Sequence, residues 1–220
     1  MSLSGRLVLF DLDGTLVDSS SGIHSSVRHA AAELGLPAPT AAQLRGMVGP
    51  PLQDGFALVL GVPVADVPRA VAAYRAHYAG GALLEATVHR GVPELLTALR
   101  AAGAILAVAT SKPELFAVRL LRHTGLLPAF ASVHGATMDG AVRHKDQVVA
   151  AALAAHPAGR DPVLVGDRSH DVLGAAAHGL PCIGAGWGPA EDGELENAGA
   201  AAVAATPADV LTVLGEIDAT

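Results

Sequence analysis

Residues 7–15 of the chain read LVLFDLDGT, four apolar residues that lead directly into an acidic segment containing a glycine. A short, unbroken apolar run is typical of a strand buried on both faces, as strands of a parallel sheet are. Asp11 and Asp13 are two residues apart, so in an extended segment their carboxylates face the same side. Two close carboxylates are unfavourable unless a cation lies between them or one is protonated. The stretch therefore predicts a buried strand that presents two acids to a cation or a shared proton.

The rest of the chain divides into a helical block and an alternating block. Within residues 17–82 the patterns are helical only, over about 22–35, 40–47, 50–60 and 66–79. From about residue 84, helical patterns alternate with apolar runs that predict strands over 104–109, 132–134, 162–165 and 182–185. The intervening helices are expected over 93–102, 113–124, 145–156, 171–177, 194–198 and 207–214. Alternation of this kind predicts βαβ units and a parallel sheet. We expect an α/β fold, a doubly wound parallel-sheet (Rossmann-like) core of residues 1–16 and 83–220, with an inserted α-helical cap domain of residues 17–82.

Polar side chains follow two further predicted strands at the points where they end. Thr110, Ser111 and Lys112 follow one strand, and Asp167 and Asp171 follow another. The carboxyl ends of parallel strands meet at one edge of the sheet, where ligands of such folds bind. We therefore expect these groups to lie near the two acids of the first strand. A few carboxylates with water and a substrate phosphate suit Mg²⁺, and a strand-to-helix turn suits an anion.

Lysine is rare in this chain. One lysine follows a predicted strand, and the other stands at the start of a predicted helix. Among 14 basic residues only Lys112 and Lys145 are lysines. Lys145 stands at the start of a predicted helix, where a positive charge is electrostatically unfavourable. A compact ammonium there can neutralise a buried carboxylate or a phosphate oxygen. Lys145 is therefore a candidate functional residue.

Four stretches, taken in order, resemble the four motifs of the haloacid dehalogenase-like hydrolase superfamily. They are DLDGTLVDS (11–19), TSKP (110–113), Lys145 and GDRSHD (166–171). The resemblance covers essentially the whole chain. It is closest to the phosphoglycolate phosphatase and 5′-nucleotidase-like branch, which carries a helical cap after the first motif. The segments VGPPL (48–52) and GVPELL (91–96) also resemble that branch.

The resemblance implies a Mg²⁺-dependent phosphatase that hydrolyses a small phosphomonoester through an aspartyl-phosphate. Asp11 would be the nucleophile, Asp13 the general acid and then the base, and Lys145 the cation that orients Asp11. The residues that the resemblance assigns to the metal are Asp11, Asp13, Asp167 and Asp171, the second through its backbone and the last through water or by bracing Lys145. The expected substrate-binding residues beside them are Thr110, Ser111 and Lys112.

One motif departs from the family pattern, and the cap adds further candidates. The third motif reads RHKD (143–146), with no proline after the lysine, so Arg143 could share or take the cationic role. The cap is expected to select the leaving group and to exclude water when closed. Its substrate-facing edge is predicted at Arg45, Gln53 and the loop of residues 46–51.

Two alternatives differ in what happens to the phosphoryl group. A phosphomutase of the same superfamily would need Asp13 equally and would keep the phosphoryl group from water. A phospho-accepting signalling receiver places its acidic pair first and its lysine last, whereas here Asp167 and Asp171 follow Lys145. Among phosphatase substrates, nucleoside 5′-monophosphates, phosphoglycolate and sugar phosphates all stay open.

Composition excludes several other classes of partner. The formal net charge of −7 disfavours nucleic acid and anionic membrane surfaces. A single cysteine, Cys182, excludes internal disulfides and fits a reducing cytoplasm. No apolar run reaches the roughly 18 residues of a membrane span, and no signal-peptide pattern is present. We expect a cytoplasmic monomer or homodimer whose partner is a small-molecule phosphate ester.

Overall fold

A six-stranded parallel sheet forms the centre of the computed structural model, which describes residues 3–217. Its strands are β1 (Arg6–Phe10), β4 (Ile105–Pro113), β5 (Ser132–Ala136), β6 (Arg160–Gly166), β7 (Cys182–Ala185) and β8 (Ala202–Ala204). They lie in the order β5-β4-β1-β6-β7-β8. The chain moves outward from β1 through β4 to β5 and then returns to β6, so the direction of winding reverses beside β1. Ligands bind at such a reversal in doubly wound sheets, and the predicted fold class is confirmed.

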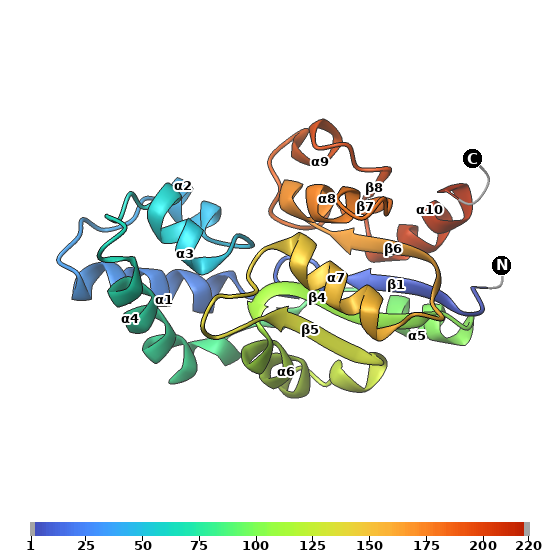
Figure 1. Ribbon diagram of the computed structural model, residues 1–220, viewed down its shortest axis with the longest axis horizontal. Helices are drawn as coiled ribbons and strands as arrows, with labels where there is room; N and C mark the ends of the chain where they lie inside the picture. Colours follow the sequence, from blue (N-terminus) through green and yellow to red (C-terminus); the bar gives the residue numbers. More distant parts are fainter. Residues whose placement is uncertain (1–2, 218–220) are drawn as a thin grey trace.

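Helices cover both faces of this sheet (Figure 1). This follows from β1, whose successive apolar side chains point to opposite faces and must be buried on both. Val8 and Phe10 pack into the cluster that includes α5 (Val92–Ala101), α6 (Glu114–His123) and α10 (Val210–Ile217). Leu7 and Leu9 point the other way, into the cluster that includes α7 (Lys145–Ala155), α8 (Ser169–Ala176) and α9 (Glu194–Asn197). Because β1 is apolar on both sides, it sits between two cores. Asp11, the next residue, therefore directly follows a strand that is packed on both faces.

A separate group of helices lies beyond the carboxyl ends of the strands (Figure 1). Its members are α1 (Ser20–Glu33), α2 (Ala41–Gly46), α3 (Leu52–Asp54), a π-helical turn (Gly55–Val59) and α4 (Val67–Ala79). The N-terminus of α2 is fixed by a capping box between Thr40 and Gln43. α1 packs along α4. This placement puts the helical segment over the end of the sheet where ligands of this fold class bind.

The chain enters and leaves the helical group through two short antiparallel strands. β2 (Val17–Asp18) pairs with β3 (Thr87–Val88), and a 3₁₀ turn (Ala82–Leu84) precedes β3. The expectation of helices alone over residues 17–82 is wrong at β2, because two residues carry no periodic signal. The expected helix over 50–60 is instead α3 followed by the π-helical turn. The boundaries of the cap domain stay a prediction.

The remaining differences are one missed strand and one shifted boundary between a strand and a helix. β8 was not predicted, since three residues of Ala and Val resemble the flanking alanine-rich segments. β4 continues through Pro113, so the Thr-Ser-Lys stretch belongs to the strand and α6 begins at Glu114. None of the described helices combines the length and the apolar character needed to cross a lipid bilayer.

Candidate active site

Three adjacent strands bring the predicted site residues together. Phe10 pairs with Val108 of β4 on one side and with Val165 of β6 on the other. Asp11 follows β1 directly, and Asp167 follows β6 directly. The polar stretches that were predicted after separate strands therefore meet at the carboxyl ends of these strands.

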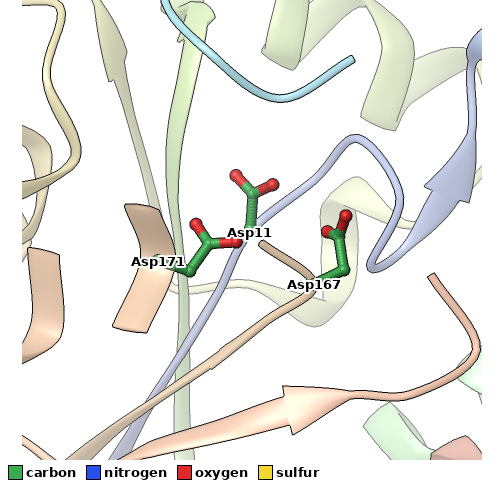
Figure 2. A group of neighbouring side chains, drawn as sticks. All are labelled: Asp11, Asp167 and Asp171. Carbon is green, nitrogen blue, oxygen red and sulfur yellow. The ribbon is translucent and has the colours of Figure 1, made fainter. Parts of the chain in front are cut away.

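Three buried carboxylates lie together at the carboxyl ends of these strands. One oxygen from each of Asp11, Asp167 and Asp171 can be chosen so that all three lie within 4.8 Å of one another. Figure 2 shows Asp11 between Asp167 and Asp171. Burial, together with the neighbouring carboxylates, raises the pKa of Asp11 from its ordinary 3.8 to about 6, against the opposing effect of Lys145.

Lys145 neutralises part of this cluster. Its Nζ lies 2.6 Å from Asp11 Oδ1 and 2.7 Å from Asp171 Oδ1, and it donates to the Ala109 carbonyl at 2.9 Å. Burial alone would lower the pKa of Lys145, but the two carboxylates raise it above its usual range. Burial also opposes ionisation of Asp171, yet Lys145 and His170 hold the pKa of Asp171 below its ordinary value. Lys145 is therefore a permanent cation that bridges two of the three acids.

Among residues 3–217, no cation forms an ion pair with the third carboxylate. Asp167 Oδ1 accepts a hydrogen bond from Thr15 Oγ1 at 2.5 Å, while Asp167 Oδ2 is buried and has no hydrogen-bond partner among the described residues. Burial, Asp171 and Asp11 raise the pKa of Asp167 well above its usual range. Three carboxylates and one ammonium carry a formal charge of −2. A dication that binds oxygen ligands would balance it, so the cluster fits Mg²⁺.

The backbone beside Asp167 leaves the space such an ion needs. Gly14 has a φ of +91°, and a Cβ placed there would lie 2.3 Å from Asp167 Oδ2. A Cβ on Gly188 would lie 2.3 Å from Asp167 Cβ. Only glycine avoids a clash with Asp167 at both points, and at Gly14 it also suits the backbone conformation. The free oxygen and the open space around it therefore coincide.

Asp13 belongs to a second ion pair. Lys112 Nζ donates to both Asp13 oxygens, at 2.8 Å and 2.6 Å, and Ser19 Oγ donates to Asp13 Oδ1 at 2.5 Å. The Lys112 ammonium also lies 4.9 Å from the centre of the Tyr78 ring. The Asp13 side chain is thus engaged by Lys112, and the Asp171 side chain by Lys145. The roles of both acids as metal ligands stay predictions.

The other predicted residues lie at different distances from this centre. Thr110 is buried, and its Oγ1 accepts from the Lys112 amide at 3.2 Å. Ser111 Oγ is buried without a hydrogen-bond partner among the described residues. Arg143 Nε lies 3.9 Å from Asp54 Oδ1, and its side chain is 41% exposed. Lys145, not Arg143, is the cation at Asp11.

The two cap candidates lie apart from Asp13. Arg45 lines a cavity of about 310 Å³ together with His24, His89 and Trp187, on the Gly14 side of the site. Gln53 lies against Gly140, where a Cβ would come within 2.7 Å of its Nε2. Neither lines the cavity that contains Asp13.

Several site residues were missed in the sequence. Thr15 and Ser19 lie inside the first motif, so their spacing from the two acids could have marked them. Arg168 donates from Nε to Glu194 at 2.9 Å and from Nη1 to the Val48 carbonyl of the helical segment at 2.7 Å. No sequence pattern marks that contact, because residues 48, 168 and 194 meet only in the folded chain.

Known proteins resemble this chain over most of its length. The family model described as haloacid dehalogenase-like hydrolase matches residues 8–185. A 5′-nucleotidase of Pseudomonas aeruginosa is 41% identical over 86% of both chains. A phosphoglycolate phosphatase of Xanthomonas campestris is 34% identical over 83% of this chain and 84% of the relative. The solved structure of a predicted phosphatase from Clostridium acetobutylicum superposes with a TM-score of 0.91 at 33% identity, over 96% of this chain and 98% of that one.

A further relative is longer than this chain. The protein named tyrosine-protein kinase PtkA of Mycobacterium tuberculosis is 46% identical over 84% of this chain, and the match spans 63% of the length of that protein.

Proposed function

Because the chain belongs to the haloacid dehalogenase-like hydrolase family, we propose that it is a Mg²⁺-dependent phosphatase of small phosphomonoesters that works through an aspartyl-phosphate. The observation that carries the proposal is the Asp11 carboxylate, held by Lys145 beside the unpaired Asp167 oxygen and two positions before Asp13. Each chemical role in phosphoryl transfer then has one side chain within this group.

In the first step, an Asp11 oxygen attacks phosphorus and the bond from phosphorus to the leaving oxygen breaks. Asp13, in its protonated form, gives its proton to that oxygen, and an alcohol leaves. Asp11 needs to be ionised, and with a pKa of about 6 it is mostly ionised at pH 7. Lys145 fixes the orientation of the attacking carboxylate.

In the second step, water attacks the phosphorus of the aspartyl-phosphate. Asp13, now ionised, takes a proton from the water while the bond between Asp11 and phosphorus breaks and inorganic phosphate is released. Lys112, which contacts both Asp13 oxygens, stabilises this ionised form. Thr110 and Ser111 are placed to hold the phosphoryl oxygens.

Asp11 and Asp167 would hold the metal, with the backbone near Asp13 as a further ligand. When bound, Mg²⁺ supplies positive charge that offsets the charge of the transferring phosphoryl group. Asp171 then acts by bracing Lys145 at 2.7 Å.

Residues 17–82 would act as the cap. The contacts that join this segment to the core include Arg168 with the Val48 carbonyl, Arg143 with Asp54, and Arg75 with the Met138 carbonyl. The β2–β3 pair is the only described sheet at the junction and would serve as the hinge. Closure would keep bulk water from the aspartyl-phosphate until the alcohol has left.

The substrate class follows from the family branch. We infer a nucleoside 5′-monophosphate or phosphoglycolate, handled in the cytoplasm by a monomer or homodimer. Transfer to another alcohol, as in a phosphomutase, would use the same Asp11 and Asp13. Only the acceptor of the phosphoryl group separates the two activities.

Phosphate release from a panel of phosphomonoesters, with Mg²⁺ and with EDTA, tests the proposal. We expect release that needs Mg²⁺ and is lost in Asp11→Asn. The control is Asp192→Asn, which removes the same kind of charge at an exposed position. Phosphoryl transfer without phosphate release would favour the mutase, and release in EDTA would contradict the magnesium requirement.

A further inference from the structure

A small cavity of about 50 Å³ lies on the Asp13 side of the site, between α4 and the end of β4. Asp13, Ser111 and Lys112 line it from the core, and Tyr74, Arg75 and Tyr78 line it from α4. Under the proposed function, on which this inference rests, Asp13 protonates the leaving oxygen. The cavity is then the place where the rest of the leaving group lies.

Three packed aromatic rings form part of the wall of this cavity. Tyr74 and Tyr78 stack with centroids 5.2 Å apart at 26°, and Phe116 meets the Tyr78 ring edge-on at 5.6 Å. Pockets for drug-sized ligands are roughly 300–1,000 Å³, so this cavity holds only a few atoms in the closed arrangement. It is too small for a nucleoside and suited to a leaving group of about two carbons.

The charges that line the cavity do not cancel. The Lys112 ammonium is compensated by the Asp13 carboxylate. Arg75 Nη1 donates to the Met138 carbonyl at 2.6 Å, and Arg75 has no carboxylate within ion-pair distance among the described residues. Arg75 Nε is buried without a hydrogen-bond partner in that part of the chain. The lining therefore carries one uncompensated positive charge.

Two hydroxyl groups add neutral hydrogen-bonding capacity. Ser111 Oγ and Tyr78 Oη are both buried and unpaired among the described residues. Burial raises the pKa of Tyr78 well above its usual range, so its phenol stays protonated and can donate. A buried guanidinium nitrogen and two buried hydroxyls without hydrogen-bond partners are unfavourable unless a ligand satisfies them.

We propose that Arg75 is a specificity-determining residue that binds a carboxylate on the leaving group. The substrate is then the phosphate ester of a short hydroxy acid, of which 2-phosphoglycolate is the smallest. The carboxylate pairs with the guanidinium at one end of the cavity, and the ester oxygen faces Asp13 at the other. The two unpaired hydroxyls, Ser111 Oγ from the core and Tyr78 Oη from α4, are further hydrogen-bonding groups of the residues that line this cavity.

The test compares two esters of equal length, 2-phosphoglycolate and 2-hydroxyethyl phosphate, in which a carboxylate is replaced by a neutral hydroxymethyl group. Hydrogen bonds to charged groups lead us to expect kcat/KM to favour 2-phosphoglycolate by about 10- to 100-fold. Arg75→Gln should reduce that ratio to near one, mainly through KM, and Arg75→Lys should keep part of it. The matched control is Arg69→Gln, on the same helix, where the arginine is exposed and donates to the Glu33 carbonyl.

Three results would overturn the assignment. One is a wild-type protein that hydrolyses both esters equally, and another is a preference that survives in Arg75→Gln. The third is an equal loss on both esters in Arg75→Gln, which would make Arg75 only a contact that closes the cap on Met138.

Calorimetry separates this inference from the proposed function. Binding of 2-phosphoglycolate is measured on Asp11→Asn with and without Arg75→Gln, so no turnover is required. Binding that depends on Arg75, in a wild type that releases no phosphate, would uphold the site and overturn the phosphatase. Phosphate release without Arg75-dependent binding would do the opposite.

Discussion

The ammonium of Lys145 lies 2.6 Å from the Asp11 carboxylate, although the two residues are 134 positions apart in the sequence. The same ammonium lies 2.7 Å from Asp171, and all three side chains are buried. One cation thus holds two acids that would otherwise repel each other across the end of the sheet. The stability of the fold and the reactivity of Asp11 depend on the same atom.

Replacing Lys145 by methionine should therefore damage both properties. Methionine keeps most of the side-chain volume but leaves two buried carboxylates without their cation. Breaking a buried ion pair by removing one partner costs about 3–5 kcal/mol. We expect a loss of that order in the free energy of unfolding, measured by urea denaturation, together with loss of phosphate release.

A second substitution shows whether the charge is responsible. In the double variant Lys145→Met with Asp171→Asn, one unpaired carboxylate is removed, so part of the stability should return while activity stays absent. If the double variant is less stable than Lys145→Met alone, packing and not charge explains the loss.

Arg143 provides the complementary prediction. Its side chain is 41% exposed and its contact with Asp54 measures 3.9 Å, and exposed pairs of this kind contribute about 0.2–1 kcal/mol. Arg143→Gln should therefore keep kcat for phosphate release within about threefold of the wild type. A loss comparable to that of Lys145→Met would show that Arg143 shares the cationic role after all.

The raised pKa of Asp11 predicts how stability depends on pH in the absence of metal. A carboxyl group whose pKa is about 6 when folded and 3.8 when unfolded binds more protons in the folded state between those values. Its contribution to stability is therefore present at low pH and is lost as the pH rises from about 4 to about 6. An asparagine side chain at this position does not titrate and has no such dependence. In EDTA at pH 7, Asp11→Asn should be more stable than the wild type by up to roughly 3 kcal/mol.

Comparing the two proteins at each pH isolates Asp11. Histidines such as His170, whose pKa is lowered by burial, have the opposite pH dependence but are common to both proteins and cancel. Urea unfolding between pH 4 and pH 7 should show a difference that grows with pH. A difference that stays constant over this range would contradict the raised pKa. Excess Mg²⁺ should reverse the order, because only the wild type keeps all the ligands.

The sequence was most informative about features that are determined by residues close together along the chain. The run of residues 7–10 followed by Asp11 and Asp13 identified a buried strand and its direction. It also identified the carboxyl end of that strand as the place where chemistry would occur. Because parallel strands align their carboxyl ends, the positions of Thr110 and Asp167 followed from the same reasoning. The helix predicted over 145–156 put Lys145 at its start, and because an ammonium there is electrostatically unfavourable, Lys145 became a candidate functional residue.

What the sequence did not reveal depends on contacts between distant segments. Tyr78 and Arg75 sit within an ordinary helical pattern, and only the approach of α4 to β4 turns them into a wall of the site. Aromatic residues are only 3% of the chain. The fold nevertheless stacks Tyr74 on Tyr78 and sets Phe116 against Tyr78. Low abundance says nothing about local concentration.

Gly14 offers a test of the metal site that leaves every charged group in place. Its φ is +91°, and a Cβ there would lie 2.3 Å from Asp167 Oδ2, the oxygen that is free to bind a cation. Gly35 also has a positive φ, +68°, but nothing lies within 4 Å of a Cβ built there. Alanine in this backbone region costs roughly 1–2 kcal/mol at either site. Both variants should therefore lose similar stability from backbone strain, and Gly14→Ala should lose more because Asp167 must move.

The two variants should differ most in their response to magnesium. We expect Gly14→Ala to need at least about tenfold more Mg²⁺ than the wild type to gain the same rise in melting temperature, a shift equivalent to about 1.4 kcal/mol. Gly35→Ala should titrate like the wild type. Melting temperatures measured across a Mg²⁺ series, without substrate, give both values. Equal titrations for Gly14→Ala and the wild type would show that the cation does not use the Asp167 oxygen beside Gly14. The formal charge of −2 on the carboxylate cluster would then have to be balanced by another ion.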